Sequence, residues 1–153
     1  MIQIITFLPL PDYKQSASTL HKVHLGKQRA EVITILNVLH EVAPASGVLY
    51  SMQIQNHPAI KMWRGYAVQL CEYGLVMCEE WIKRGYRDVT AKSQIEWHMD
   101  MATSGAFTME KPPWLGDEAL HLSHRSNLLR KMPSHYRNFW PDDPDNLQYV
   151  WPV

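Results

Sequence analysis

The chain has 153 residues and no net charge, because 15 Lys and Arg balance 15 Asp and Glu. This length fits one domain, since domains are commonly about 100–150 residues long. Hydrophobic residues make up 46% of the chain, yet no run approaches the roughly 20 apolar residues of a membrane-spanning helix. A neutral chain is unlike a protein that coats nucleic acid or a membrane through its overall field. We expect one cytoplasmic domain over residues 1–153 with no membrane partner.

The first residues predict an extended arm followed by a short helix. Residues 4–8 are apolar except for Thr6, and Pro9 and Pro11 end this strand-like or extended segment. Asp12 suits the N-cap of a helix over about residues 13–21. The N-terminal segment has neither a leading basic residue nor a small-residue cleavage site, so it does not resemble a secretory signal.

Helical periodicity resumes in the next segment. Apolar residues recur at helical spacings at Leu25, Val32, Ile35, Leu36 and Leu39. Gly26 interrupts this pattern near its beginning, and the helix is expected to end before Pro44.

A long amphipathic helix is predicted in the middle of the chain. Pro58 suits its first turn, its apolar face extends to Trp81, and Lys83-Arg84-Gly85 suits its end. Cys71 and Cys78 lie inside this helix, about 10 Å apart along its axis. That separation is too large for a disulfide, so we expect both thiols to be reduced.

Two more helices and a tail complete the chain. One helical segment is expected over residues 93–101, and a last helix begins at an Asp117 cap and runs to about Lys131. The tail from Pro141 onward ends in aromatic residues and is expected to dock on the body. The predicted fold is all-α: a compact bundle of about three to five helices with an extended N-terminal arm and an irregular C-terminal tail.

The first candidate site lies on the predicted second helix. Four polar residues three or four positions apart share one helix face: His24, Lys27, Gln28 and Glu31. Arg29 lies to one side of them. Gly26 precedes a Lys-Gln-Arg helix start, whose free backbone N–H groups could hold a phosphate. The alternative is a solvated, salt-bridged helix face.

The second candidate site is Asn56-His57-Pro58, with Arg64 shortly after it. A histidine at a helix N-terminus has its pKa lowered by the helix dipole, so it can act as a neutral acid, base or donor. The alternative is that Asn56 or His57 simply caps the helix.

The third candidate site is a basic surface near the C-terminus. No acid occurs between Leu120 and Trp140. This segment contains the polar and basic side chains His124, Arg125, Asn127, Arg130 and Lys131. Such a mixture is typical of surfaces that bind phosphate backbones, and nearby aromatic rings could stack on bases. The alternative is a plain solvated helix.

Metal binding is a further alternative. His21/His24 and His121/His124 are spaced three apart, and two facing pairs would supply four imidazoles. No cysteine pair or HExxH motif accompanies them. We therefore expect neither a metal nor a cofactor.

Several segments together resemble the pyrimidine-dimer DNA glycosylase family, and in particular a bacterial branch of it. The segments are Phe7-Leu-Pro9, Leu25 to Arg29, Asn56 to Tyr66, Lys83 to Tyr86, Pro112 to Asp117, Ser123 to Lys131 and Tyr149 to Val153. The resemblance implies a small all-α enzyme that excises damaged pyrimidines from DNA.

The resemblance also implies a mechanism. An N-terminal α-amine, here that of Met1, attacks the sugar C1′, and the strand is cleaved through an imine. An α-amine suits this role because its pKa is about 7.7–8.0. In the family a glutamate on the first long helix assists the sugar chemistry. His24 occupies that position in this chain, and Glu31 is the acid that could substitute for it.

The predicted function is therefore a DNA base-excision N-glycosylase, with AP-lyase activity as an option. Its partner would be duplex DNA with a damaged or modified pyrimidine, and a monomer is favoured. Glu31 or His24 would act as acid or base, with His57 and Asn56 contacting the base or sugar. The DNA contacts would come from Lys27, Gln28, Arg29, Asn56, Arg64, His124, Arg125, Asn127, Arg130 and Lys131. The alternatives are a non-catalytic DNA- or nucleotide-binding module and a different enzyme for modified pyrimidines.

Overall fold

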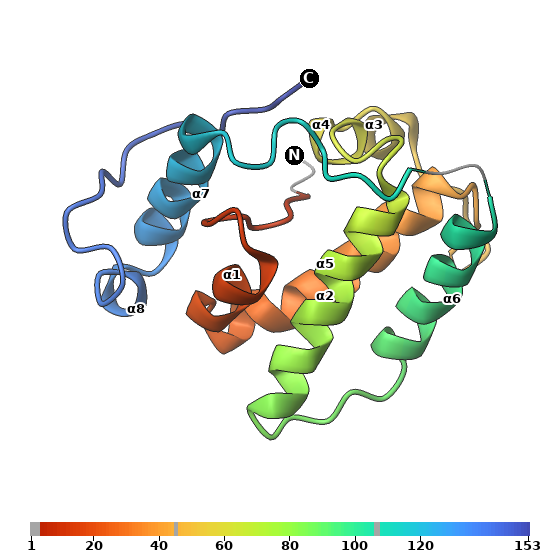
Figure 1. The fold of residues 1–153 in the computed structure, drawn as a ribbon, viewed down its shortest axis with the longest axis horizontal. Coiled ribbons are helices and arrows are strands. Elements are labelled where there is room, and N and C mark those ends of the chain that lie inside the picture. The colour runs from red at the N-terminus through yellow and green to blue at the C-terminus, as the bar shows by residue number, and fades with distance from the viewer. Residues whose placement is uncertain (1–3, 45, 106–107) are drawn as a thin grey trace.

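Helices account for all the regular secondary structure in residues 4–44, 46–105 and 108–153, which the computed structural model describes (Figure 1). In these residues the helices are α1 (Tyr13–Thr19), α2 (Lys22–Leu39), α3 (Met52–Gln55), α4 (Pro58–Lys61), α5 (Ala67–Lys83), α6 (Ala91–Ser104), α7 (Glu118–Lys131) and α8 (Pro133–Tyr136). The predicted all-α fold is confirmed. Five of these helices are longer than one turn, within the predicted three to five, and α3, α4 and α8 are additional single turns of four residues each.

Two of the predicted helix starts are confirmed by their caps. The Asp12 carboxylate accepts a hydrogen bond from Gln15 N at 2.8 Å, and the Asp117 carboxylate accepts one from Ala119 N at 3.1 Å. Each cap satisfies a backbone N–H group that has no partner within its helix. The helix after Asp117 ends at Lys131, as predicted.

Two helix boundaries differ from the prediction. Helix α2 continues through Gly26, where a Cβ would stand 3.1 Å from the Trp81 ring, so the glycine permits close packing rather than a break. The predicted long helix is split, because α4 ends at Lys61 and α5 begins only at Ala67. Gly65 turns the chain between them with a φ of 86°, a conformation that glycine adopts without strain.

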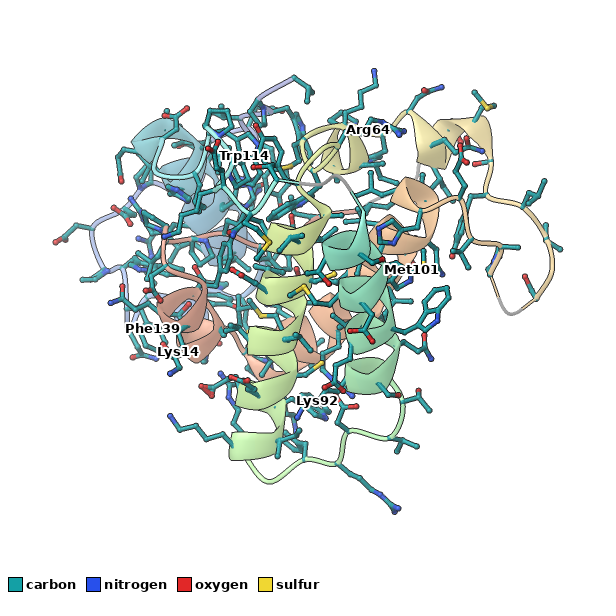
Figure 2. All side chains as sticks on the ribbon, turned by 45° about the vertical axis from the view of Figure 1, so that its right-hand side comes forward. Lys14, Arg64, Lys92, Met101, Trp114 and Phe139 are labelled. Carbon is teal, nitrogen blue, oxygen red and sulfur yellow. The ribbon has the colours of Figure 1, made fainter. Side chains whose placement is uncertain are left out.

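The core is built around three helices that pack on one another, α2, α5 and α6 (Figure 1). Side chains fill the space between these ribbons (Figure 2). Helix α5 contributes Leu70, Tyr73 and Met77 to this core. The three helices approach closely at Gly74, where a Cβ would lie 2.7 Å from Val32 Cγ1.

We expect Gly74→Ala to lower the free energy of unfolding by about 1–3 kcal/mol, the usual cost of overpacking a core. The added methyl would also lie 3.0 Å from Ile95 Cδ1, so both α2 and α6 would have to move. This cost opposes the gain in helix propensity, about 1 kcal/mol. Urea denaturation would measure it, with Glu79→Ala on the exposed face of α5 as the control. An unchanged urea midpoint in Gly74→Ala would contradict the close packing of α2 and α6 against Gly74.

The segment before α1 is an extended arm, and it is buried although it joins no sheet. Ile5 and Leu8 are in the core. The arm's backbone is held by side chains: Gln28 accepts from Phe7 N at 2.9 Å and donates to Ile5 O at 3.1 Å. These bonds replace the ladder that a strand would form, since buried backbone groups need partners.

The C-terminal tail docks along α7, as predicted. Ser126 Oγ accepts from Leu147 N at 2.9 Å, and Ser123 Oγ accepts from Val150 N at 3.0 Å. Helix α7 is thus covered by the arm and by the tail. Among the described helices, none is both long and apolar enough to span a bilayer.

Candidate functional site

A cleft of about 590 Å³ opens where the arm, α2, α4, α7 and the tail meet. It has an apolar part and a polar part. The apolar part comes from the arm, α2 and the tail, and the polar part from α2, α4 and α7. The lining residues are Ile4, Ile5, Phe7, Val23, His24, Lys27, His57, Asn127, Arg130, Lys131, Tyr149 and Trp151. The cleft thus joins residues of all three sequence candidates, of which the first and third are 100 residues apart in the chain.

The charged side chains that line the cleft are all cationic. They are Lys27, Arg130 and Lys131, and no carboxylate is found among the described residues that line the cleft. Lys131 has no salt bridge with the residues the structure describes, and Lys27 reaches only Glu31, at 3.7 Å. Arg130 donates to the carbonyls of Asp145 and Leu147, which leaves its charge without a carboxylate partner in the described chain. The cleft therefore favours an anionic ligand.

Glu31 lies behind the arm rather than in the lining of the cleft. Its carboxylate accepts a hydrogen bond from Ile5 N at 3.0 Å, and its side chain is 11% exposed. Burial raises the pKa of this carboxyl, while the Ile5 N–H and the Lys27 ammonium act in the opposite direction. Glu31 therefore holds the arm against α2 at the edge of the cleft.

His24 projects from α2 into the cleft. Its Nδ1 lies 2.7 Å from the Tyr136 hydroxyl, and its ring stacks on the Tyr136 ring with centroids 5.6 Å apart. Burial is the main cause that lowers the pKa of His24 to about 4, and nearby positive charges, first among them Lys131, contribute to the same shift. His24 is therefore neutral at pH 7.

His57 both caps a helix and lines the cleft. Its Nδ1 accepts a hydrogen bond from Ala59 N at 3.0 Å, so the capping interpretation is confirmed. Its ring also meets the edge of Trp151, with centroids 5.7 Å apart. Asn56 and Arg64 are exposed nearby but do not line the cleft.

Three residues predicted to contact DNA are instead buried and bonded within the protein. Gln28 holds the arm and accepts from the Tyr73 hydroxyl at 2.7 Å. His124 Nδ1 accepts from Leu8 N at 2.9 Å. Arg125 donates to Pro9 O at 2.9 Å and pairs with Glu118 and Asp143. Because each of these groups is buried and already bonded within the protein, we infer structural roles for them.

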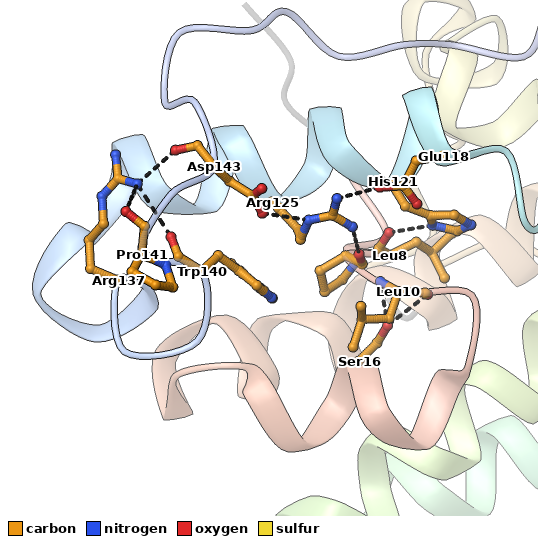
Figure 3. Close-up of polar contacts among 11 residues, drawn as sticks. Leu8, Leu10, Ser16, Glu118, His121, Arg125, Arg137, Trp140, Pro141 and Asp143 are labelled. Carbon is orange, nitrogen blue, oxygen red and sulfur yellow. Dashed lines mark hydrogen bonds and ion pairs between the residues drawn. The ribbon is translucent and has the colours of Figure 1, made fainter.

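Figure 3 shows how Arg125 joins three parts of the chain. Its guanidinium contacts the first turn of α7 through Glu118 at 2.5 Å, the tail through Asp143 at 2.8 Å and the end of the arm through Pro9 O at 2.9 Å. The same view shows His121, whose Nδ1 lies 2.8 Å from Leu8 O on the arm.

Two other predicted contacts are only partly available. Arg29 pairs with Asp88 at 2.9 Å and lies over the Trp81 ring at 4.7 Å, away from the cleft lining. Asn127 does line the cleft, but its amide group bonds to Ser123 O and to Arg130. Asn127 is thus part of the wall of the cleft, whereas Arg29 ties α2 to the segment before α6.

The predicted histidine pairs are used in different ways. His121 and His124 bond to the backbone of Leu8, whereas His21 caps α2 and His24 lines the cleft. Over the described ranges, no group of three or more His, Cys, Asp or Glu residues could hold a metal ion.

Tyr136 was not predicted to be the partner of His24. Tyr149 and Trp151 were not predicted to line a site, although the aromatic tail was predicted to dock. The signal in the sequence was the large number of aromatic residues in the last 20 positions, because a tail that stays in solvent has no use for so many large rings.

The histidines that hold the arm make the folded state sensitive to acid. Burial lowers the pKa of His124 to about 3, against an ordinary value near 6.5. The unfolded chain takes up this proton at a higher pH than the folded chain does. The contribution of neutral His124 to the free energy of unfolding is therefore complete above pH 6.5 and is lost as the pH drops toward 3. At pH 5 we expect this one group to cost about 2 kcal/mol.

Thermal or urea unfolding between pH 7.5 and 5 would measure this loss. In His124→Asn a side-chain oxygen replaces Nδ1 as the acceptor for Leu8 N but does not titrate. We expect this variant to lose less stability on acidification than the parent. An equal loss in both proteins would assign the acid sensitivity to other buried histidines, such as His98.

Comparison with known proteins identifies the family. A sequence model described as pyrimidine dimer DNA glycosylase matches residues 4–94, which is 91 of the 153 residues. The chain belongs to this family. The matched segment supplies the arm, His24, Lys27 and His57, whereas the cations of α7 and the aromatic tail lie beyond it. No curated protein and no solved structure matches the chain.

Proposed function

We propose that the chain is a DNA N-glycosylase that excises damaged or modified pyrimidines at this cleft. The observation that carries the proposal is the cleft itself. In a member of a DNA glycosylase family, the arm borders a hollow whose charged lining residues are all cationic. Such a hollow suits a nucleotide that has been flipped out of the duplex, with its phosphates on Lys27, Arg130 and Lys131.

In the proposed reaction the nucleophile is an α-amine. Its nitrogen bonds to C1′ as the bond from C1′ to the base breaks, and the base leaves with the electron pair and takes up the proton that the amine nitrogen loses. Opening of the bond from C1′ to the ring oxygen then gives the imine, with the electron pair on the ring oxygen, which takes up the second proton of the nitrogen. Met1, which would supply this amine, lies outside the described residues. Ile4 and Ile5 line the cleft, and this places the start of the described arm at the site. Glu31 would position the arm, and His24 would face the nucleotide.

The test is incubation with duplexes that contain a thymine dimer, an abasic site or hydroxymethyluracil, followed by borohydride trapping. A trapped covalent complex would support an amine nucleophile that forms an imine, and strand cleavage in samples without borohydride would support the lyase step. Base release without trapping would support an enzyme that uses water instead of an amine. An undamaged duplex of the same sequence is the control.

A non-catalytic binding module is the second candidate function. The observation in its favour is that His24 is neutral and that Glu31 already accepts the Ile5 N–H. Salt-sensitive binding to all three damaged duplexes, with neither base release nor trapping, would support this candidate over the glycosylase.

A further inference from the structure

The Tyr136 hydroxyl links the start of α2 to the wall of the cleft. Tyr136 is fully buried on α8, and its oxygen accepts a hydrogen bond from His21 N at 3.0 Å. The same oxygen lies 2.7 Å from His24 Nδ1. Its ring is stacked between His24 and Trp140, with centroids 5.6 and 5.5 Å away. The hydroxyl is thus held from several sides.

The hydrogen-bond requirements of this group fix the direction of its bond to His24. A backbone N–H can only donate, so the bond from His21 N uses an acceptor position of the Tyr136 oxygen. The hydroxyl proton then needs an acceptor of its own, because a buried donor without one is costly. Among the described residues, His24 Nδ1 is the acceptor in reach. The Tyr136 O–H therefore donates, and His24 Nδ1 accepts.

This direction determines where His24 carries its remaining proton. A neutral imidazole has one N–H group, so an Nδ1 that accepts leaves the proton on Nε2. His24 Nε2 bonds to no described residue and is not buried. Since His24 lines the cleft, this N–H is available there to a ligand.

The surroundings of His24 favour the neutral ring. His21 at the start of α2, Lys27 on α2, Lys131 on α7 and His135 on α8 all oppose a further positive charge. On the arm side the ring meets Phe7, an apolar neighbour, with centroids 5.4 Å apart. No carboxylate is found among these neighbours to stabilise an imidazolium.

We infer that Tyr136 is a positioning residue that fixes His24 as its Nε2–H tautomer, so that His24 donates a hydrogen bond to an acceptor oxygen of the bound nucleotide. The identity of the ligand in this inference rests on the proposed function, whereas the tautomer of His24 does not depend on it. It also gives His24 a chemistry opposite to that of a carboxylate in the same place, because a carboxylate only accepts. The site would select a ligand that presents a carbonyl, phosphate or sugar oxygen at this point.

The tautomer can be tested in the free protein by long-range proton–nitrogen NMR of the His24 ring. We expect a protonated Nε2 and an unprotonated Nδ1 at pH 7. In Tyr136→Phe, which keeps the ring stack, we expect the Nδ1–H tautomer to appear and the pKa of His24 to rise toward its ordinary value. Tyr86→Phe, which removes a hydroxyl outside this cluster, should leave the His24 signals unchanged. A protonated Nδ1 in the parent, or an unaltered ring in Tyr136→Phe, would overturn the inference.

The ligand contact needs a separate measurement on DNA that contains an abasic site or a thymine dimer. We expect His24→Phe to bind this DNA about 5- to 10-fold more weakly than the parent, the effect of one lost hydrogen bond. Equal binding would overturn the donor role while leaving the tautomer intact. A parent protein that binds none of the DNA would instead refute the proposed function, and the NMR result would still stand.

Discussion

Replacing both exposed lysines of the cleft, in Lys27→Gln/Lys131→Gln, is expected to weaken DNA binding about 60-fold at 0.1 M salt. Each cation that contacts a phosphate releases counterions, and log K falls with log salt by about 0.9 per contact. Two lost contacts reduce this slope by about 1.8. Between about 1 M salt, where phosphate contacts contribute little, and 0.1 M salt, the affinities of parent and variant therefore diverge by about 60-fold. Fluorescence anisotropy of a labelled abasic duplex at several salt concentrations would measure both quantities.

The matched control is Lys14→Gln/Lys83→Gln, which removes the same charge from exposed side chains that do not line the cleft. Lys14 lies on α1, away from Arg64 and the α4 end of the molecule (Figure 2). We expect this control to change the salt slope by much less. Equal slopes for the two double variants would mean that DNA binds through the overall field rather than in the cleft.

The helices were predictable because their signals are local. Asp12 and Asp117 are capping residues whose partners lie two or three positions away, so the sequence alone contains the whole interaction. Gly65 and Gly26 were harder to interpret, since a glycine can end a helix or admit a neighbouring ring. The deciding neighbour of Gly26 is Trp81, which is 55 residues away.

The candidate site was predictable in part for the same reason. His24 and Lys27 share a helix face through spacing, and both line the cleft. The use of α7 was not predictable from spacing. Its histidines, serines and Arg125 resemble an exposed phosphate-binding surface, but most of them bond to the arm and the tail. His124, for example, bonds to Leu8, which is 116 residues away.

Arg125→Met is expected to lower the free energy of unfolding by about 3 kcal/mol. Breaking a buried ion pair usually costs about 3–5 kcal/mol, because the partners keep their desolvation penalty. The lower end applies here because Glu118 is 71% exposed and regains water easily, whereas Asp143 is only 29% exposed. Pro9 O would also lose its donor, so the arm and the tail should loosen together.

Arg87→Met is the matched control, since Arg87 is exposed and has no salt bridge with any described residue. We expect it to change stability by less than about 0.5 kcal/mol. The salt slope of DNA binding, measured where both variants are folded, separates the two roles considered for Arg125. A structural tie leaves the slope unchanged, whereas a phosphate contact lowers it by about 0.9. A stable Arg125→Met with a reduced slope would therefore return Arg125 to the DNA-binding surface.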